Sequence, residues 1–236
     1  MSVSGIAAAH GRDPVAATEM ILNRRRLLAA LPALSLGVGL AGCTFVATPK
    51  RIVAGGEDAN AGGFAPNAMV DAIWDAKVLP YLKANAASFP DLMKAIHANA
   101  NEAGRRFGHR AKEGDQPWTY IVRIDGPVIA AETASRAATI TIDDGGKALV
   151  QIGPAMRGTA LRDSLDFVSF NDFKNQIDFA QYGKAFNQHV LRTILANLPR
   201  DSLIGRKASV LGAFTFEGGD QPPVVAPAQI TLGPAS

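Results

Sequence analysis

The chain has 236 residues, with 24 Lys and Arg against 21 Asp and Glu, and a single cysteine. Residues 1–42 hold 4 of these basic residues and 2 of the acidic ones, so the remaining 194 residues carry 20 basic against 19 acidic side chains. A near-neutral chain without a basic stripe does not fit nucleic-acid binding, and one cysteine excludes a disulfide within the chain.

The segment before Cys43 has the three parts of a secretion signal. Three arginines at 24–26 precede an apolar run, Leu27 to Leu40, and small residues fill positions 41 and 42. The run of 14 residues would span about 21 Å as a helix, short of the roughly 30 Å core of a bilayer. A signal peptide is therefore favoured over a membrane-spanning or buried helix. The sequence predicts a signal peptide over residues 1–42 and lipid attached to Cys43.

The same region bears on where translation begins and on the route of export. Residues 1–19 form a polar preface that is unusual for a signal peptide, so translation is expected to begin at Met20. The arginine run also resembles a twin-arginine signal, although general secretion is the favoured interpretation. Thr44 is not the aspartate associated with inner-membrane retention, so the predicted location is the inner or outer membrane, facing the periplasm.

Two segments with different composition follow the cysteine. Residues 43–63 are predicted to be the lipidated cysteine and a flexible tether, because they contain few large apolar residues and two Ala-Gly-Gly triplets. Residues 64–113 are predicted to be helical. Apolar residues there recur at helical spacing, interrupted where Pro80 is expected to kink or break the first helix. A second helix is expected to begin near Pro90, with Ser88 as its cap and Gly108 as its stop.

Residues 114–236 are predicted to form a β-barrel-like domain. Alternating residues from 118 to 124 predict a strand, and Asp125-Gly126-Pro127 predicts a turn. The next predicted elements are strands at 128–132 and 137–142, a hairpin turn at Asp143-Asp144-Gly145-Gly146, a strand at 148–152, a helix near 177–198, and strands at 205–216 and 224–232.

Strands in runs, not alternating singly with helices, indicate an α+β fold over an antiparallel sheet. The order favours an N-terminal helical segment followed by an antiparallel OB-like β-barrel with an inserted helix. A β-sandwich is the alternative.

Motifs for nucleophilic catalysis, metal binding or phosphate binding do not occur in the sequence. The histidines His97, His109 and His189 lie on predicted helical regions and are expected to be surface or edge residues, not bases. Asp143 and Asp144 are better explained as turn residues than as a cation site. No cofactor and no metal are therefore expected.

Two neighbouring stretches carry the residues that are best suited to binding. Thr159 is a predicted helix N-cap whose free N–H groups would suit an anion, and polar side chains then alternate with phenylalanines. Such a set suits a sugar or small polar ligand. The alternative is an internal polar network with Arg157 or Arg162 paired to Asp163 or Asp172. The candidate ligand-binding residues are Arg157, Thr159, Arg162, Asp163, Asn171, Asp172, Asn175 and Gln176.

These stretches also resemble a known family. The run Q-I-G-P-x-x-R-G-T-A-L-R-D at 151–163, followed by F-N-D-F-x-N-Q-I at 170–177, is similar to DUF2291, a family of predicted periplasmic lipoproteins of unknown function. Members are often encoded beside sugar ABC-transporter genes, so the resemblance implies a role near carbohydrate uptake. It implies no catalytic residues.

The sequence thus predicts a non-catalytic binding or accessory module, held at the membrane by its N-terminal lipid. Its expected partner is an ABC-transporter component or a small polar ligand, and not nucleic acid. The alternative is an envelope enzyme that acts on a small polar or carbohydrate substrate with Asp163 or Asp172 as acid or base. A paired-carboxylate mechanism would require two such groups about 5–9.5 Å apart.

Overall fold

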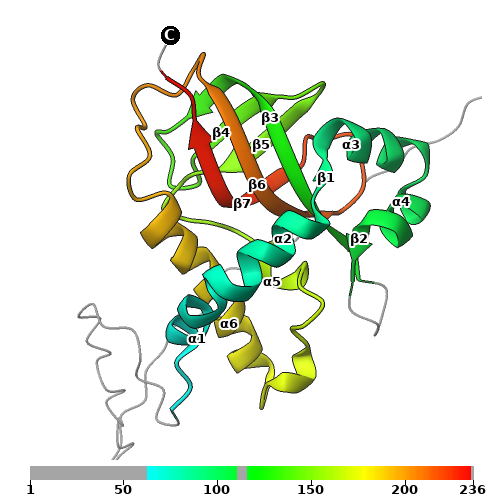
Figure 1. Ribbon diagram of the computed structural model, residues 1–236, viewed down its shortest axis with the longest axis vertical. Coiled ribbons are helices and arrows are strands. Elements are labelled where there is room, and N and C mark those ends of the chain that lie inside the picture. The colour runs from blue at the N-terminus through cyan, green and yellow to red at the C-terminus, as the bar shows by residue number, and fades with distance from the viewer. Residues whose placement is uncertain (1–62, 111–115, 235–236) are drawn as a thin grey trace, which may run out of the picture. The chain divides into compact units, whose positions relative to one another are not determined.

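The computed structural model describes residues 63–110 and 116–234, all within the unit Ala54–Ser236 (Figure 1). Met20, Cys43 and the rest of the predicted signal peptide and tether up to residue 62 lie outside the described residues, so what the sequence predicts for them stays a prediction. The same holds for the predicted boundary at residue 113, which falls in the segment 111–115.

The first helical stretch has three parts: α1 (Pro66–Ile73), a π-helical turn η1 (Trp74–Val78) and α2 (Leu79–Asn85). The apolar stripe that the sequence predicts is present, because residues four apart along the stretch are fully or almost fully buried. They are Val70, Trp74, Val78 and Leu82.

Of the predicted kink or break at Pro80, the break is wrong, since α2 continues to Asn85, while the helix is irregular directly before the proline. A proline ring ordinarily clashes with the carbonyl four residues back. Here the preceding turn is π-helical, and the Leu79 N–H donates to the Trp74 carbonyl, five residues back. The wider turn directly before Pro80 accommodates the ring without ending the helix.

The next segment contains β1 (Ala87–Ser88), α3 (Phe89–Ala98), α4 (Ala100–Phe107) and β2 (Gly108–His109). Ser88 caps α3 as predicted, its hydroxyl accepting the Asp91 N–H at 3.4 Å. The single helix expected up to Gly108 is instead two helices. Asn99 leaves the helical conformation and caps α4 by accepting the Glu102 N–H at 3.0 Å, a role that asparagine fills well.

Strand β3 (Trp118–Glu132) runs straight through the predicted turn at Asp125-Gly126-Pro127. That prediction is wrong because tertiary pairing overrides the turn signal. Residues 118–127 pair with β6, and residues 128–132 pair with β4, so β3 changes partner just after Gly126. A Cβ at Gly126 would overlap the main-chain oxygen of Asp143, so glycine there permits the close approach of the neighbouring strand.

The hairpin predicted around Asp143-Asp144-Gly145-Gly146 is confirmed. It joins β4 (Thr139–Asp143) to β5 (Lys147–Gln151), and Gly145 takes a φ of 66°. The remaining elements are α5 (Ala160–Asp163), the 3-10 helix η2 (Phe170–Asp172), α6 (Gln176–His189), the π-helical turn η3 (Val190–Ile194), β6 (Lys207–Phe216) and β7 (Val224–Leu232).

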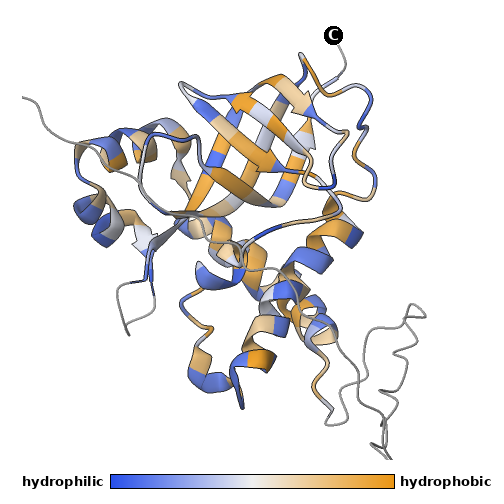
Figure 2. Cartoon of the chain, turned by 180° about the vertical axis from the view of Figure 1, so that it is seen from behind, coloured by the Kyte–Doolittle hydropathy of each residue, from blue (hydrophilic) through white to orange (hydrophobic). Residues whose placement is uncertain are grey.

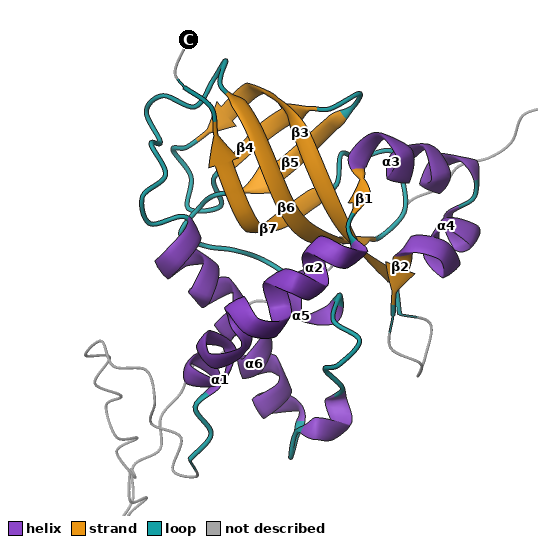
Figure 3. Cartoon of the chain, viewed as in Figure 1, coloured by secondary structure: helices purple, strands orange, loops and turns teal. Residues whose placement is uncertain are grey.

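The strands pair in a ring (Figure 3). β3 pairs with β4 and β6, β4 with β5, β5 with β7, and β7 with β6. These pairings are antiparallel except that of β5 with β7, and register shifts in β3–β4 and β6–β7 make the ring irregular. Helix α6 is inserted between β5 and β6. The predicted α+β, OB-like fold is thus confirmed.

The hydrophobic core extends from the sheet to the helices. Hydrophobic residues recur along the strands in Figure 2, and fully buried side chains such as Tyr120, Ile124 and Phe214 come from them. Helix α1 packs against α6. The rings of Trp74 and Phe186 lie 6.1 Å apart there, which joins the helical segment to the inserted helix.

Candidate functional site

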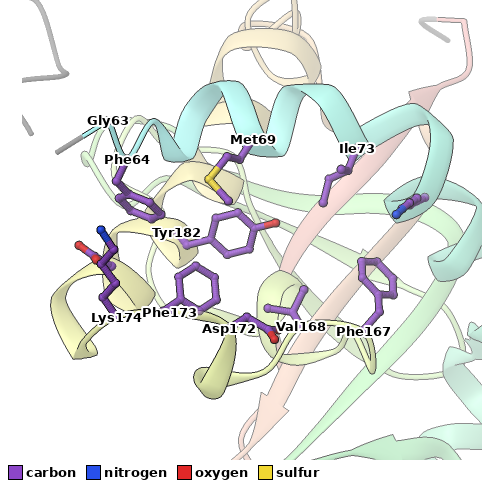
Figure 4. A pocket seen from close by; sticks show the side chains of 12 residues that line it. Gly63, Phe64, Met69, Ile73, Phe167, Val168, Asp172, Phe173, Lys174 and Tyr182 are labelled. Carbon is purple, nitrogen blue, oxygen red and sulfur yellow. The ribbon is translucent and has the colours of Figure 1, made fainter.

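A pocket of about 440 Å³ lies where α1, the loop after α5 and the beginning of α6 meet (Figure 4). Its volume falls within the roughly 300–1,000 Å³ usual for small-ligand sites. Its lining combines apolar and aromatic side chains with two lysines and two aspartates. The lining residues are Gly63, Phe64, Met69, Ile73, Lys77, Phe167, Val168, Asp172, Phe173, Lys174, Asp178 and Tyr182.

Aromatic rings in mutual contact form one wall of the pocket. The Phe173 ring lies 5.0 Å from that of Tyr182 and 6.2 Å, edge-on, from that of Phe64. Tyr182 in turn meets Phe186 edge-on at 5.2 Å in the core. Because this chain of rings continues into buried structure, the wall is held in place before any ligand arrives.

Helix α1 and the π-helical turn supply another wall. Met69, Ile73 and Lys77 are spaced four residues apart and all line the pocket, beside the stripe that is buried against the core. Met69 is 42 % exposed, which is high for a large apolar side chain and reflects its position at the open pocket.

Tyr182 is the most buried polar group of the lining, with 5 % of its surface exposed. Figure 4 shows its ring near Met69 and Phe173, with the hydroxyl directed into the pocket. Burial raises the pKa of Tyr182 above 10.0, and the negative charge of Asp172 raises it further. The hydroxyl therefore stays protonated at neutral pH and can donate a hydrogen bond.

The two aspartates are each fixed by a local bond at a helix beginning. Asp172 Oδ2 accepts the Ser169 N–H at 2.9 Å, which completes a capping box on η2. Asp178 Oδ2 accepts from the Asn175 side chain at 3.2 Å. Each carboxylate is thus held by its own segment, on a residue that lines the pocket.

The two lysines of the lining have no such partner. Lys77 and Lys174 are exposed, and the ion pairs of the described residues involve only Arg162, His189 and Arg192 as cations. The pocket therefore presents two ammonium groups without a carboxylate within 4.0 Å.

Of the residues that the sequence singled out, Asp172 alone is in the pocket lining. Arg162, Asp163 and Thr159 form a separate cluster beside α6. Arg162 Nε donates to Asp163 Oδ1 at 2.7 Å, and Thr159 donates to Asp163 Oδ2 at 2.5 Å. This is the internal network that the sequence offered as the alternative to a ligand site.

Helix α6 also contacts this cluster. Arg162 Nη1 donates to the Phe179 carbonyl at 2.8 Å, and its guanidinium lies 3.6 Å from the centre of the Phe179 ring. Gly183 permits this approach, because a Cβ there would fall 2.8 Å from Arg162 Nη1 and 2.7 Å from the methyl group of Thr159. Thr159 is at the N-cap position of α5, as the sequence predicts, but its side chain makes no capping hydrogen bond.

The other predicted residues have local roles or lie on the surface. Asn175 is the N-cap of α6 and accepts the Asp178 N–H at 2.9 Å. Arg157 has an exposed side chain, and its main-chain N–H and carbonyl are held by Gln151 at 2.7 and 3.2 Å. Asn171 and Gln176 are exposed and do not line the pocket.

Sequence reasoning missed most of the pocket. For residues 64–113 the sequence predicts only apolar residues at helical spacing, and Tyr182 is not among its candidate ligand-binding residues. The signal that could have separated pocket from core was Lys77, a charged residue on an otherwise apolar stripe.

Within residues 63–110 and 116–234 no three His, Cys, Asp or Glu side chains group as a metal ion would require. Among these same residues, no helix combines the length and the apolar character needed to cross a bilayer.

Comparisons with known proteins bear on family and fold. A family model described as predicted periplasmic lipoprotein (DUF2291) matches residues 33–231. An OB-fold protein from Thermotoga maritima, of known crystal structure, superposes with a TM-score of 0.59 at 16% identity, over 72% of this chain and 99% of that one. An OBody bound to hen egg-white lysozyme gives a TM-score of 0.25 at 14% identity, over 48% and 80% of the two chains. A search of curated proteins gave no match.

Proposed function

Because the chain belongs to the DUF2291 family of predicted periplasmic lipoproteins, we propose that it is a membrane-anchored, non-catalytic module that binds a small polar ligand at the periplasmic face. The family description gives the location, a lipoprotein of the cell envelope facing the periplasm. The ligand-binding role is the proposal.

The pocket between α1 and α6 is the observation that supports this role. It has the volume of a small-ligand site, a preformed aromatic wall, and two aspartates that are held by local hydrogen bonds. Such a combination is suited to binding and orienting a small polar ligand.

The proposal extends to sugar uptake by an ABC-type transporter. This link rests on the family resemblance, since members are often encoded beside sugar-transporter genes. It predicts that deletion of the protein lowers the rate at which cells take up the radiolabelled ligand. Unchanged uptake would contradict the link to transport and leave binding in place.

The enzyme alternative has weaker support. Asp163 is bonded to Arg162 and Thr159 and does not line the pocket, whereas Asp172 does. A pair of carboxylates that acts as acid and base must face one substrate. These two aspartates belong to different surroundings.

The test is a thermal-shift and calorimetric screen of the full-length protein in detergent against mono- and disaccharides and common metabolites. We expect a saturable rise in Tm with one class of compound. Met69→Trp, which fills the pocket from α1, should abolish the shift, whereas Trp at the neighbouring exposed Ala68, outside the lining, should not. A flat panel, or equal binding in the Met69 variant, would contradict the proposal.

A further inference from the structure

The free polar groups of the pocket define what a ligand must offer. Asp172 and Asp178 each use Oδ2 in a local bond, at 2.9 and 3.2 Å, and no described residue donates to either Oδ1. A carboxylate oxygen accepts hydrogen bonds only. A matching ligand therefore carries hydroxyl or other donor groups at two places.

The lysines set the charge of the ligand. Lys77 belongs to the π-helical turn after α1, whereas Lys174 lies just before α6, so the two ammonium groups reach the pocket from different elements. Neither has a carboxylate partner among the described residues. An ammonium group binds a carboxylate through a short, charge-assisted hydrogen bond, so an anionic ligand satisfies a lysine that a neutral one leaves unpaired.

Tyr182 and the phenylalanine rings beside it limit the shape of a ligand. The Tyr182 hydroxyl, on a residue only 5 % exposed, has no hydrogen-bond partner among the described residues and points into the pocket. This hydroxyl can therefore donate a hydrogen bond to a ligand and can also accept one. The rings of Phe64 and Phe173 beside it offer flat apolar surfaces, against which the C–H groups of a saturated ring can pack.

We infer that the pocket binds a sugar acid, a hydroxylated ring that carries one carboxylate, an inference that rests on the proposed binding function. The carboxylate meets a lysine, the ring hydroxyls meet the aspartates and Tyr182, and the C–H groups lie on the aromatic wall. A neutral sugar would leave both lysines unused. An aromatic carboxylate without several hydroxyl groups would offer the two aspartates fewer hydrogen-bond donors.

Matched ligands test the inference directly. Calorimetry on the full-length protein in detergent compares D-glucuronate and D-galacturonate with D-glucose and D-galactose, which have the same rings without the carboxylate, and with 4-hydroxybenzoate. We expect a uronate to bind about ten-fold or more tightly than its neutral counterpart, with an affinity that falls as salt is raised.

Variants assign that preference to the pocket. The double variant Lys77→Gln/Lys174→Gln should remove the preference for the uronate, whereas Lys83→Gln/Lys184→Gln, at exposed positions outside the lining, should keep it. Tyr182→Phe retains the ring and should weaken both members of a pair alike.

Several results would overturn the inference. Equal binding of glucose and glucuronate would refute the sugar acid and leave the proposed binding function intact. If 4-hydroxybenzoate binds and neither uronate does, the ligand is a flat aromatic acid and not a saturated sugar ring. No binding by any of these five compounds would exclude sugar acids of this size, while the wider metabolite screen tests the binding function separately.

Discussion

Nδ1 of His189 lies 2.6 Å from Oδ1 of Asp71, and this hydrogen bond connects the last residue of α6 to α1. Arg192 Nη2 approaches both oxygens of the same carboxylate at 3.1 and 3.2 Å, and the His189 ring stacks on Trp74 at 4.0 Å. Because α1 and α6 supply two walls of the pocket, this contact helps to fix the distance between them.

The contact gives stability a defined dependence on pH. The hydrogen bond with His189 lowers the pKa of Asp71 from 3.8, and the charge of Arg192 acts in the same direction, while partial burial opposes both. A carboxyl group with a lowered pKa stabilises the fold fully above its ordinary pKa, and the contribution is lost as pH falls through the lowered value. Asp71 is 48 % exposed, so the expected contribution is at most about 1 kcal/mol.

Urea unfolding of Asp71→Asn and wild type at several pH values measures this contribution. The difference in unfolding free energy should be constant from pH 7 to about 5 and should shrink below pH 4. A difference that stays the same down to pH 2.5 would show that the charge of Asp71 contributes nothing.

Gly183→Ala should destabilise the protein by about 1–3 kcal/mol, because the added methyl group would crowd Arg162 and Thr159 in a packed region. In an open helix the same change would be stabilising. Thermal unfolding of Gly183→Ala and of the double variant with Thr159→Ser, which removes the crowding methyl group, separates the two cases. The double variant should recover part of the loss, and a Gly183→Ala variant more stable than wild type would contradict the close contact.

Asn175→Ala should lower stability by about 0.5–2 kcal/mol through loss of the cap on α6. Asn175→Asp, which can also cap the helix, is the matched control and should retain most of the stability that the cap contributes. Asn175 does not line the pocket, but its Nδ2 donates to Asp178 Oδ2, so ligand affinity measured by calorimetry should fall modestly in both variants, which lack this donor. A capping loss near zero with a large loss of affinity would assign Asn175 to the ligand instead.

Gly126→Ala should be among the most damaging single changes in the sheet, at about 2 kcal/mol or more, because the new Cβ would overlap the main-chain oxygen of Asp143 where β3 changes partner. Gly146→Ala in the adjacent hairpin has only an ordinary contact with Phe89 and should be nearly neutral. Chemical unfolding of both variants tests the comparison. Similar losses in the two would mean that the strands can move apart at Gly126.

Cys43→Ala should release the protein from the membrane. If the cysteine carries the lipid, the variant should appear in the soluble or unprocessed fraction, and metabolic labelling with a radioactive fatty acid should be lost. Cell fractionation followed by immunoblotting measures this outcome. A labelled, membrane-bound Cys43→Ala protein would refute lipid attachment at this residue.

The fold could be predicted from the sequence because local patterns and tertiary packing agree over most of the described residues. The β4–β5 hairpin and strand β7 follow from turn chemistry and alternation. The disagreements occur where packing overrides a local signal. Gly126 resembles a turn residue but serves close strand packing, and the π-helical turn before Pro80 has no signature in the sequence.

The candidate site was harder to predict from the sequence than the fold was, and for a different reason. A pocket forms between segments far apart in the chain, such as Met69 of α1 and Tyr182 of α6, and their meeting depends on the packing of the two helices. Conversely, polar residues that the sequence singled out, such as Arg162 and Asn175, form hydrogen bonds with residues close to them in the chain. Only Asp172 belongs to both groups.

The pairing of Trp118 with Phe216 joins the beginning of β3 to the end of β6, almost a hundred residues later, and β7 completes the ring. Contacts so distant in sequence form slowly, since a long loop must close before they stabilise anything. The ring therefore cannot be finished until the last strands have been synthesised.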